Sequence, residues 1–292
     1  MTVERDASGA DEVYVHAGGQ GVWVARIIEA LGHDAVLCGP FGGETGGMVK
    51  HLVEAEGIEI RSTKTRGANG SYVHDRRAGH RREVAEVKAP GLDRHETDDL
   101  FGDAFLAGMD CGHLVITGPM HEQHLAPELF ARLASDLSKN GVRVTADVSG
   151  ATLAALDGGI DFLKVSHEEL IAGGYSADES ESSLIEGLRA LAPKARNVVV
   201  SRADKGVLAL IDGKLVRAHG PAVSPRDPSG AGDSMTGALA CGAAEERGAE
   251  AALSLGLAAG AMNATRLGRG SGSNEHIREF ARHIRIEGLY DG

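Results

Sequence analysis

Asp227-Pro228-Ser229-Gly230-Ala231-Gly232-Asp233 is the stretch that decides the fold, because it leads directly into the apolar, Gly/Ala-rich segment 234–244. We interpret it as a glycine turn that opens a buried helix. Small residues at a helix start leave backbone N–H groups pointing outward at the positive end of the helix dipole, and such a turn binds anions. Asp233 would lie beside the anion and could take a proton from an incoming hydroxyl, which indicates phosphoryl transfer to an alcohol. The alternative is that Asp233 only caps the helix.

The composition limits the class of protein. The chain has 292 residues, of which 42% are hydrophobic, enough for one large α/β domain or two small ones. The net charge of −12 argues against a general nucleic-acid or anionic-membrane surface. The first twenty residues are polar and no apolar run suits a membrane span, so we expect a cytoplasmic protein. Cys38, Cys111 and Cys241 lack ligand-like spacing and are expected to be reduced core thiols.

Helical and extended patterns alternate along most of the chain. Helices are predicted over 22–31, 45–56, 126–139, 168–173 and 180–191. Strands are predicted over 33–39, 114–117, 142–146, 162–165 and 197–201, and a hairpin over 205–217 with its turn at Asp212-Gly213. This order predicts an α/β fold with a mostly parallel sheet that is covered by helices on both faces.

Two segments interrupt this alternation. Residues 12–17 and 68–88 look extended and contain no convincing helix. They suit a small antiparallel sheet attached to the core, and such attachments often serve as lids or subunit interfaces. We therefore expect an α/β core of residues 18–67 and 89–292, with a β lid formed by residues 1–17 and 68–88.

A second glycine cluster, His16-Ala17-Gly18-Gly19-Gln20-Gly21, also precedes a helix. It lacks the Gly-x-Gly-x-x-Gly spacing of a dinucleotide site, and taken alone it is only a strand-to-helix turn. Together, the two clusters resemble the signatures of the ribokinase-like (PfkB) carbohydrate kinases, an early Gly-Gly-x-Gly and a late Asp-Thr-x-Gly-Ala-Gly-Asp. The resemblance extends over nearly the whole chain, including 39–46, 117–119, 147–150 and 164–170. It is nearest to the 1-phosphofructokinase and tagatose-6-phosphate kinase branch.

For the donor end, the resemblance implies an ATP-dependent kinase. Asp233 would be the catalytic base, and the amides of Gly230, Ala231 and Gly232 would form the anion hole. Lys164 and Glu169 match the family's Lys-Pro-Asn-x-x-Glu segment, whose Glu helps to organise Mg²⁺ around the triphosphate. In this chain Val165 and Ser166 replace the Pro and Asn, and the alternative for Glu169 is a solvated helix face.

Three further residues match nucleotide-contacting positions of the family. Ser201 and Gly206 lie in a Ser-x-Gly-x-x-Gly-like loop, in which Ala203 replaces the first glycine. Asn263 would approach the adenine, or else is an ordinary polar residue of its helix. Pro228 replaces a Thr in a loop that often helps to bind a monovalent cation, so such a cation is a further candidate ligand.

The acceptor end departs from the family. Gly18, Gly19 and Gln20 would contact the substrate, and Asp147 either faces the acceptor or is structural. The sugar-phosphate branch has a Lys and an Asn where this chain has Gln20 and Trp23. It also has a lid Arg where this chain reads 70–72 as Gly-Ser-Tyr. The loss of each charge-assisted contact would cost a sugar phosphate ~1.5–3 kcal/mol of binding free energy.

Four lid arginines bear on whether the chain can bind the phosphate of a sugar phosphate. Rescue of phosphate binding by Arg76, Arg77, Arg81 and Arg82 is one interpretation, and simple solvent exposure is the other.

The start of the chain is a second departure. Family members open with a central strand whose Asp binds sugar hydroxyls. Residues 1–11 have no room for it, so we expect the sheet to lack its first strand, either because the chain begins downstream of its natural start or because a shortened form exists.

The sequence therefore predicts a kinase that uses ATP and Mg²⁺ to phosphorylate a hydroxyl group of a carbohydrate or sugar-phosphate-like substrate. It is expected to form a homodimer through the lid, and no nucleic acid or membrane is expected as a partner. One alternative is a nucleoside or other small-alcohol kinase of the same fold, with Trp23 and Tyr72 as stacking faces. The other is a catalytically silent protein that binds a nucleotide or sugar.

Overall fold

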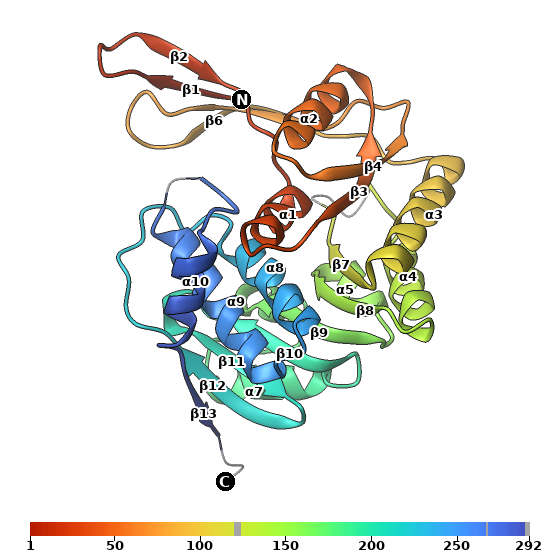
Figure 1. Cartoon of the computed structure of the whole chain (residues 1–292), viewed down its shortest axis with the longest axis vertical. Coiled ribbons are helices and arrows are strands. Elements are labelled where there is room, and N and C mark those ends of the chain that lie inside the picture. The colour runs from red at the N-terminus through yellow and green to blue at the C-terminus, as the bar shows by residue number, and fades with distance from the viewer. Residues whose placement is uncertain (120–123, 267, 290–292) are drawn as a thin grey trace.

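The main sheet of the computed structural model has seven strands in the order β13-β12-β11-β10-β9-β8-β7 (Figure 1). The structure describes residues 1–119, 124–266 and 268–289. Strands β7 to β10 run parallel, and β11, β12 and β13 continue the sheet antiparallel. The strands are His113–Thr117 (β7), Arg143–Asp147 (β8), Ile160–Ser166 (β9), Ala195–Ser201 (β10), Val207–Ile211 (β11), Lys214–His219 (β12) and Arg285–Gly288 (β13).

Helices cover both faces of this sheet, which confirms the predicted α/β fold. One face carries Pro127–Lys139 (α4), Gly150–Ala155 (α5), His167–Ala172 (α6) and Glu181–Leu191 (α7). The other carries Ala231–Ala244 (α8) and Ala249–Ala264 (α9), against which Gln20–Ala30 (α1) and Asn274–Ala281 (α10) pack. Strand β10 shows the physical reason, because Val198 and Val200 pack on the α7 side and Val199 on the α8–α9 side. Burying each such side chain contributes roughly 1.5–3 kcal/mol.

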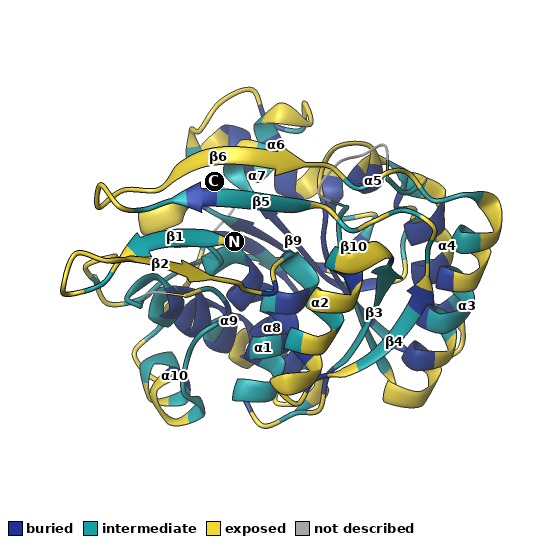
Figure 2. Ribbon diagram, turned by 90° about the horizontal axis from the view of Figure 1, so that it is seen from above, coloured by how far each residue is buried: buried dark blue, intermediate teal, exposed yellow. Residues whose placement is uncertain are grey.

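The lid is a separate four-stranded sheet in the order β2-β1-β5-β6. Its strands are Thr2–Arg5 (β1), Asp11–Tyr14 (β2), Ser71–Asp75 (β5) and Arg82–Val87 (β6). The β1–β2 and β5–β6 pairs are antiparallel, as predicted, whereas β1 and β5 run parallel. Figure 2 shows that the outer strands β2 and β6 are exposed and that the inner strands are partly covered. The expected extended segments therefore form one mixed sheet.

Three details differ from the sequence patterns. The strand predicted over 33–39 lies at Val36–Phe41 (β3), because the residues before it close α1; there the amide of Ala35 donates to Glu29 Oε1 at 2.7 Å. Cys111 is exposed rather than in the core, whereas Cys241 is buried and Cys38 is half-buried. The short 3₁₀ turn Ala203–Lys205 (η1) precedes β11.

No helix in the described part of the chain is long and apolar enough to cross a bilayer.

A gap separates the main sheet from a two-stranded parallel sheet, β3 and Glu59–Lys64 (β4). This two-stranded sheet packs with Gly43–Ala55 (α2) and Arg94–Cys111 (α3). Within the described ranges no strand pairs with the second edge of β3 or with the outer edge of β7. A cavity of about 1250 Å³ lies there, lined by both strands, α1 and α3. The described β1 belongs to the lid, so the main sheet lacks the central strand that the resemblance would place here.

An extended apolar segment would pair with these two edges and fill the cavity, which Met1 also lines. We expect that six Val- and Ile-rich residues fused ahead of Met1 raise the midpoint of thermal unfolding by roughly 4 °C or more, since about 1 kcal/mol shifts it by ~2–4 °C in a chain of this size. Differential scanning calorimetry measures the change. The control is a fusion of equal length made of Ser and Gly; equal midpoints for the two fusions would contradict the expectation.

Candidate active site

The glycine turn leads into α8 as expected, at the carboxyl ends of the parallel strands. Gly230 adopts the left-handed conformation (φ 82°) and precedes the first helical residue. A Cβ atom there would lie 3.0 Å from Cβ of Arg269, so glycine suits both the backbone and the space. The amide of Ala231 is already used, because it donates to the carbonyl of Pro228 at 3.2 Å. In the described chain the amides of Gly230 and Gly232 have no backbone acceptor, and they remain the candidate anion-binding donors.

Asp233 lies in the first turn of α8 and is only 8% exposed. Burial raises the pKa of its carboxyl group to about 6, and the nearby negative charge of Asp147 adds to the effect. Lys164 and Arg269 oppose this rise. A carboxylate with a pKa close to neutral is a better proton acceptor than one with an ordinary value, so this environment suits a general base.

A buried ion pair lies directly behind Asp233. Lys164 Nζ, on β9, donates to both carboxylate oxygens of Asp147, on β8, at 3.1 and 3.2 Å. The hydroxyl of Thr236, on α8, donates to Asp147 Oδ2 at 2.7 Å. Burial alone would lower the pKa of Lys164, but the charges of Asp147, Glu169 and Asp233 raise it above its usual value. Lys164 is therefore charged, and Asp147 is satisfied within the protein.

This arrangement favours a structural role for Asp147 over the predicted contact with the acceptor. Asp147 is 3% exposed and its carboxylate is shared between Lys164 and Thr236. Lys164 lies beneath the turn, since a Cβ atom on Gly232 would be 2.7 Å from Lys164 Nζ. Its direct contact with nucleotide stays a prediction, while its charge adds to the positive potential at the start of α8.

The other donor-side residues gather at the ends of β9 and β10. Ser201 ends β10, and Gly206 (φ 75°) follows the 3₁₀ turn, where a Cβ atom would come within 2.4 Å of the carbonyl of Ala218. Glu169 forms a capping box with Ser166 at the start of α6, with Ser166 N donating to Glu169 Oε2 at 2.7 Å. One carboxylate oxygen of Glu169 is thus engaged. Neither the nucleotide contacts nor the metal contact is tested by this geometry.

Asn263 braces the turn from behind. It is fully buried on α9, its amide nitrogen donates to the carbonyl of Ser229 at 3.0 Å, and its oxygen accepts from the amide of Ser271 at 3.2 Å. This placement favours the alternative of a structural helix residue over the predicted approach to adenine. Asn263 instead holds the loop before α8 against the loop that carries Arg269.

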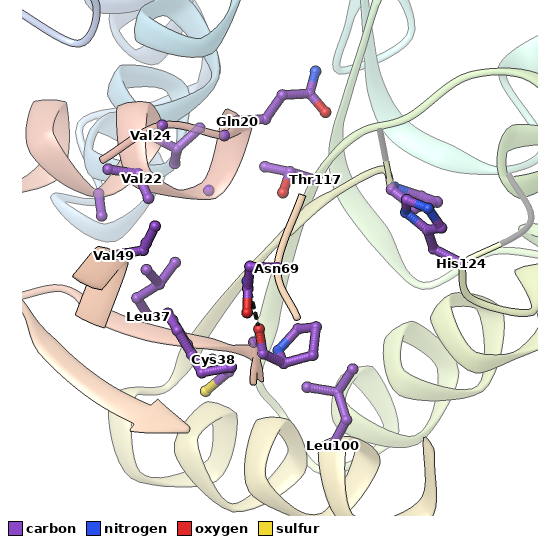
Figure 3. Close-up of a pocket in the computed structure, with 18 of the residues that line it drawn as sticks. Gln20, Val22, Val24, Leu37, Cys38, Val49, Asn69, Leu100, Thr117 and His124 are labelled. Carbon is purple, nitrogen blue, oxygen red and sulfur yellow. Dashed lines mark hydrogen bonds between the residues drawn. The ribbon is translucent and has the colours of Figure 1, made fainter. Parts of the chain in front are cut away.

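The early glycine cluster lies at the large cavity. Gly19 (φ 118°) precedes α1 and Gln20 is its first residue, while a Cβ atom on Gly21 would lie 3.1 Å from Leu37 and 3.7 Å from the hydroxyl of Thr117. Figure 3 shows Gln20 and Thr117 on one side of the pocket, away from Leu37 and Val49. The aliphatic part of the cavity offers few partners for sugar hydroxyls, so an acceptor fits the glycine cluster rather than the gap between the sheets.

Two site residues were missed from the sequence. Thr236 lies one turn after Asp233 on the same helix, and that i, i+3 spacing was a usable signal. Arg269, in the loop after α9, stacks its guanidinium 4.4 Å above the ring of Trp23. No local sequence pattern indicates that contact, because α1 and the loop meet only in the folded chain.

Comparisons with known proteins agree with this geometry. The sequence matches the family described as pfkB family carbohydrate kinase over residues 2–276. It is 25% identical to 1-phosphofructokinase of Vibrio cholerae, over 94% of this chain and 87% of that protein. It is 28% identical to ATP-dependent 6-phosphofructokinase isozyme 2 of Escherichia coli, over 83% of this chain and 80% of that protein.

Solved structures are also similar. The structure of phosphofructokinase-2 from Escherichia coli in complex with potassium superposes with a TM-score of 0.85 at 25% identity, and the one in complex with fructose-6-phosphate with a TM-score of 0.82 at the same identity. Each pair covers 96% of this chain and 94% of the other. The fold is therefore shared with these kinases over nearly the whole chain.

The raised pKa of Asp233 has a consequence for stability. The unfolded chain loses this proton near pH 4, whereas the folded chain keeps it up to about pH 6. The carboxyl group therefore favours the folded state at low pH, and that contribution is lost as the pH rises through 6. We expect Asp233→Asn to raise the free energy of unfolding by about 1–3 kcal/mol at pH 7.5, and by about half as much at pH 5.

Urea unfolding of the two proteins at both pH values measures this difference. Asp99→Asn, which changes an exposed aspartate on α3, is the control and should leave the free energy of unfolding unchanged at either pH. A gain from Asp233→Asn that does not depend on pH would contradict the assigned pKa.

Proposed function

The chain belongs to the pfkB family of carbohydrate kinases, and we propose that it transfers the γ-phosphoryl group of ATP to a hydroxyl group of a sugar or sugar phosphate, with Asp233 as the base. The observation that carries the proposal is the buried carboxyl group of Asp233, with a pKa of about 6, next to the amides of Gly230 and Gly232. Asp233 would accept the hydroxyl proton while the amides stabilise the charge on the transferred group.

The donor end fits a nucleotide triphosphate. The start of α8, with Lys164 beneath it, presents positive potential to phosphate oxygens, and Ser201, Gly206 and Glu169 lie at the ends of the neighbouring strands. In the described residues no group of three His, Cys, Asp or Glu side chains could hold a metal by itself. Mg²⁺ would neutralise the triphosphate, and one carboxylate such as Glu169 together with phosphate oxygens is the ligand set that it commonly uses.

A monovalent cation near the turn has weaker support. The Escherichia coli phosphofructokinase-2 structure is a complex with potassium. Here the carbonyls of Pro228 and Ser229 already accept hydrogen bonds from Ala231 and Asn263. Binding of a monovalent cation to this loop therefore stays a prediction from the resemblance.

A sugar or sugar phosphate is favoured over a nucleoside as acceptor. The two relatives named above are both phosphofructokinases. The stacking faces that would suit a base are engaged, because Arg269 covers Trp23, and Tyr72 packs against His74 with ring centroids 5.3 Å apart. A silent binding protein would not need the perturbed carboxyl group of Asp233.

Asp233→Asn tests the proposed base. We expect kcat with a sugar-phosphate acceptor to fall by about 10²–10⁴-fold, since a positioned general base contributes that much. ATP binding, measured by isothermal titration calorimetry, should change little. For the unaltered protein, kcat/KM should fall tenfold per pH unit below about 6, where Asp233 becomes protonated.

The control is again Asp99→Asn, which should leave kcat unchanged because Asp99 is exposed. An Asp233→Asn protein with near-normal turnover would rule out this base. Nucleotide binding without turnover on any sugar, sugar phosphate or nucleoside would instead support the silent alternative.

We also propose that the protein forms a homodimer through the lid. The outer strands of the lid expose Val13 and Val87 by 61 and 60%, and a second copy of the chain could cover these apolar side chains. We expect Val13→Asp combined with Val87→Asp to convert a dimer into a monomer in sedimentation velocity. Leu106→Asp, at a side chain on α3 that is 61% exposed, should leave the dimer intact. A monomeric unaltered protein would refute the proposal.

A further inference from the structure

The hairpin of β5 and β6 carries four arginines, three in its turn and Arg82 at the start of β6, and their partners differ. Arg77 and Arg82 lie 3.0 and 3.1 Å from Asp75 Oδ2, and Arg77 also contacts Asp11 at 2.9 Å. These arginines hold the pKa of Asp75 well below its usual range, chiefly through the hydrogen bond from Arg77. Both charges are thus balanced within the lid and are not available to a substrate.

Arg76 connects the lid to the core. Its guanidinium lies 3.6 Å from Asp227 and 3.7 Å from Glu4. Asp227 is the first residue of the glycine turn and also accepts from the amide of Ser229 at 3.0 Å. This ion pair places the β5–β6 turn over the start of α8.

Arg81 is the remaining lid arginine. Its Nη2 lies 2.9 Å from Nε2 of His74, which is buried and therefore has a lowered pKa, so this neighbour is a neutral acceptor. Glu83, which is mostly exposed, lies 4.0 Å from the same nitrogen of His74, and in the described part of the chain no carboxylate lies within 4.0 Å of the Arg81 guanidinium. Arg81 thus lies at an exposed position on the lid.

Arg269 lies opposite on the core. It is half-buried over Trp23, its Cβ adjoins Gly230, and in the described part of the chain no carboxylate lies within 4.0 Å of its guanidinium. Burial lowers its pKa, and the next largest cause is the positive charge of Arg81. The Arg76–Asp227 pair holds the turn that carries Arg81 at the start of the glycine turn, and Arg269 adjoins Gly230, so one guanidinium group of the lid and one of the core lie near the same turn.

We infer that Arg269 and Arg81 bind the phosphate group of a phosphorylated acceptor. Two like charges near each other are unfavourable without a counter-ion, and a phosphate dianion would relieve that repulsion with charge-assisted hydrogen bonds. Trp23 supports the assignment, because its ring fixes the Arg269 guanidinium between the early glycine cluster and Gly230. The pair would replace the cationic ligands absent at Gln20 and Ser71. This inference rests on the proposed function and narrows its acceptor to a phosphate monoester.

Kinetics of single variants test the assignment. With fructose 6-phosphate or fructose 1-phosphate as acceptor, whichever turns over faster, we expect Arg269→Gln and Arg81→Gln each to raise the KM for the acceptor about tenfold or more. The KM for ATP and kcat should change less than threefold. The acceptor KM of Arg269→Lys should lie between that of the unaltered protein and that of Arg269→Gln, because lysine keeps the charge and loses the planar guanidinium group. Arg77→Gln, on the same turn but paired with Asp75 and Asp11, should leave both KM values unchanged.

Several outcomes would overturn the inference. One is a rise in the KM for ATP with an unchanged acceptor KM, because the pair would then hold the donor phosphates. Others are an equal effect of Arg77→Gln, or fructose binding as tightly as its phosphates.

Calorimetry separates this inference from the proposed kinase activity. The unaltered protein, Arg269→Gln, Arg81→Gln and Arg77→Gln are titrated with each fructose phosphate and with fructose, in the presence of a non-hydrolysable ATP analogue. Loss of sugar-phosphate binding in the first two variants alone supports the inference even if no turnover is found. Equal binding by all four proteins, or binding by none of them, refutes it.

Discussion

The buried contact between Asp147 and Lys164 is the interaction on which the rest of the site depends. It joins the ends of β8 and β9, and Thr236 connects it to α8. Removing either charge would leave the other unpaired in the interior, which typically costs 3–5 kcal/mol. Burial is the main cause of the raised pKa of Asp233, and the two charges of the pair act on it in opposite directions, since Asp147 raises it and Lys164 lowers it. The ion pair thus holds together the elements around Asp233, while burial raises the pKa of its carboxyl group.

The lid is positioned by charges in the same way. Asp75 and Asp11 hold Arg77 and Arg82 within the lid, and Asp227 holds Arg76 across to the turn. Among the described residues Arg81 is therefore the lid arginine with no carboxylate within 4.0 Å, and its positive charge adds to the lowering of the Arg269 pKa by burial. Surface ion pairs contribute little to stability, but here they decide which guanidinium groups remain open to a ligand.

Much of the fold and of the donor end was predictable from local patterns. Hydrophobic periodicity located the helices and strands from 113 to 219 except the short helix α5, and the turn from Asp227 to Asp233 indicated the start of α8. The exceptions have tertiary causes. The amide of Ala231 is used inside the turn, Asn263 braces the turn, and the lid contains a parallel pair between β1 and β5. Each depends on a partner that is distant in sequence.

By itself, the sequence determined the α/β alternation and the anion-binding turn, because both follow from backbone geometry and spacing within a few residues. Only the tertiary structure decided which charges are paired. Asp147 meets Thr236 across 89 positions, and Arg269 meets Trp23 through the packing of a late loop on α1. The strength of a charge in a protein depends on its burial and its neighbours. The charges that surround Asp233, and the position of Arg269 over Trp23, therefore became identifiable only once these distant segments were placed together.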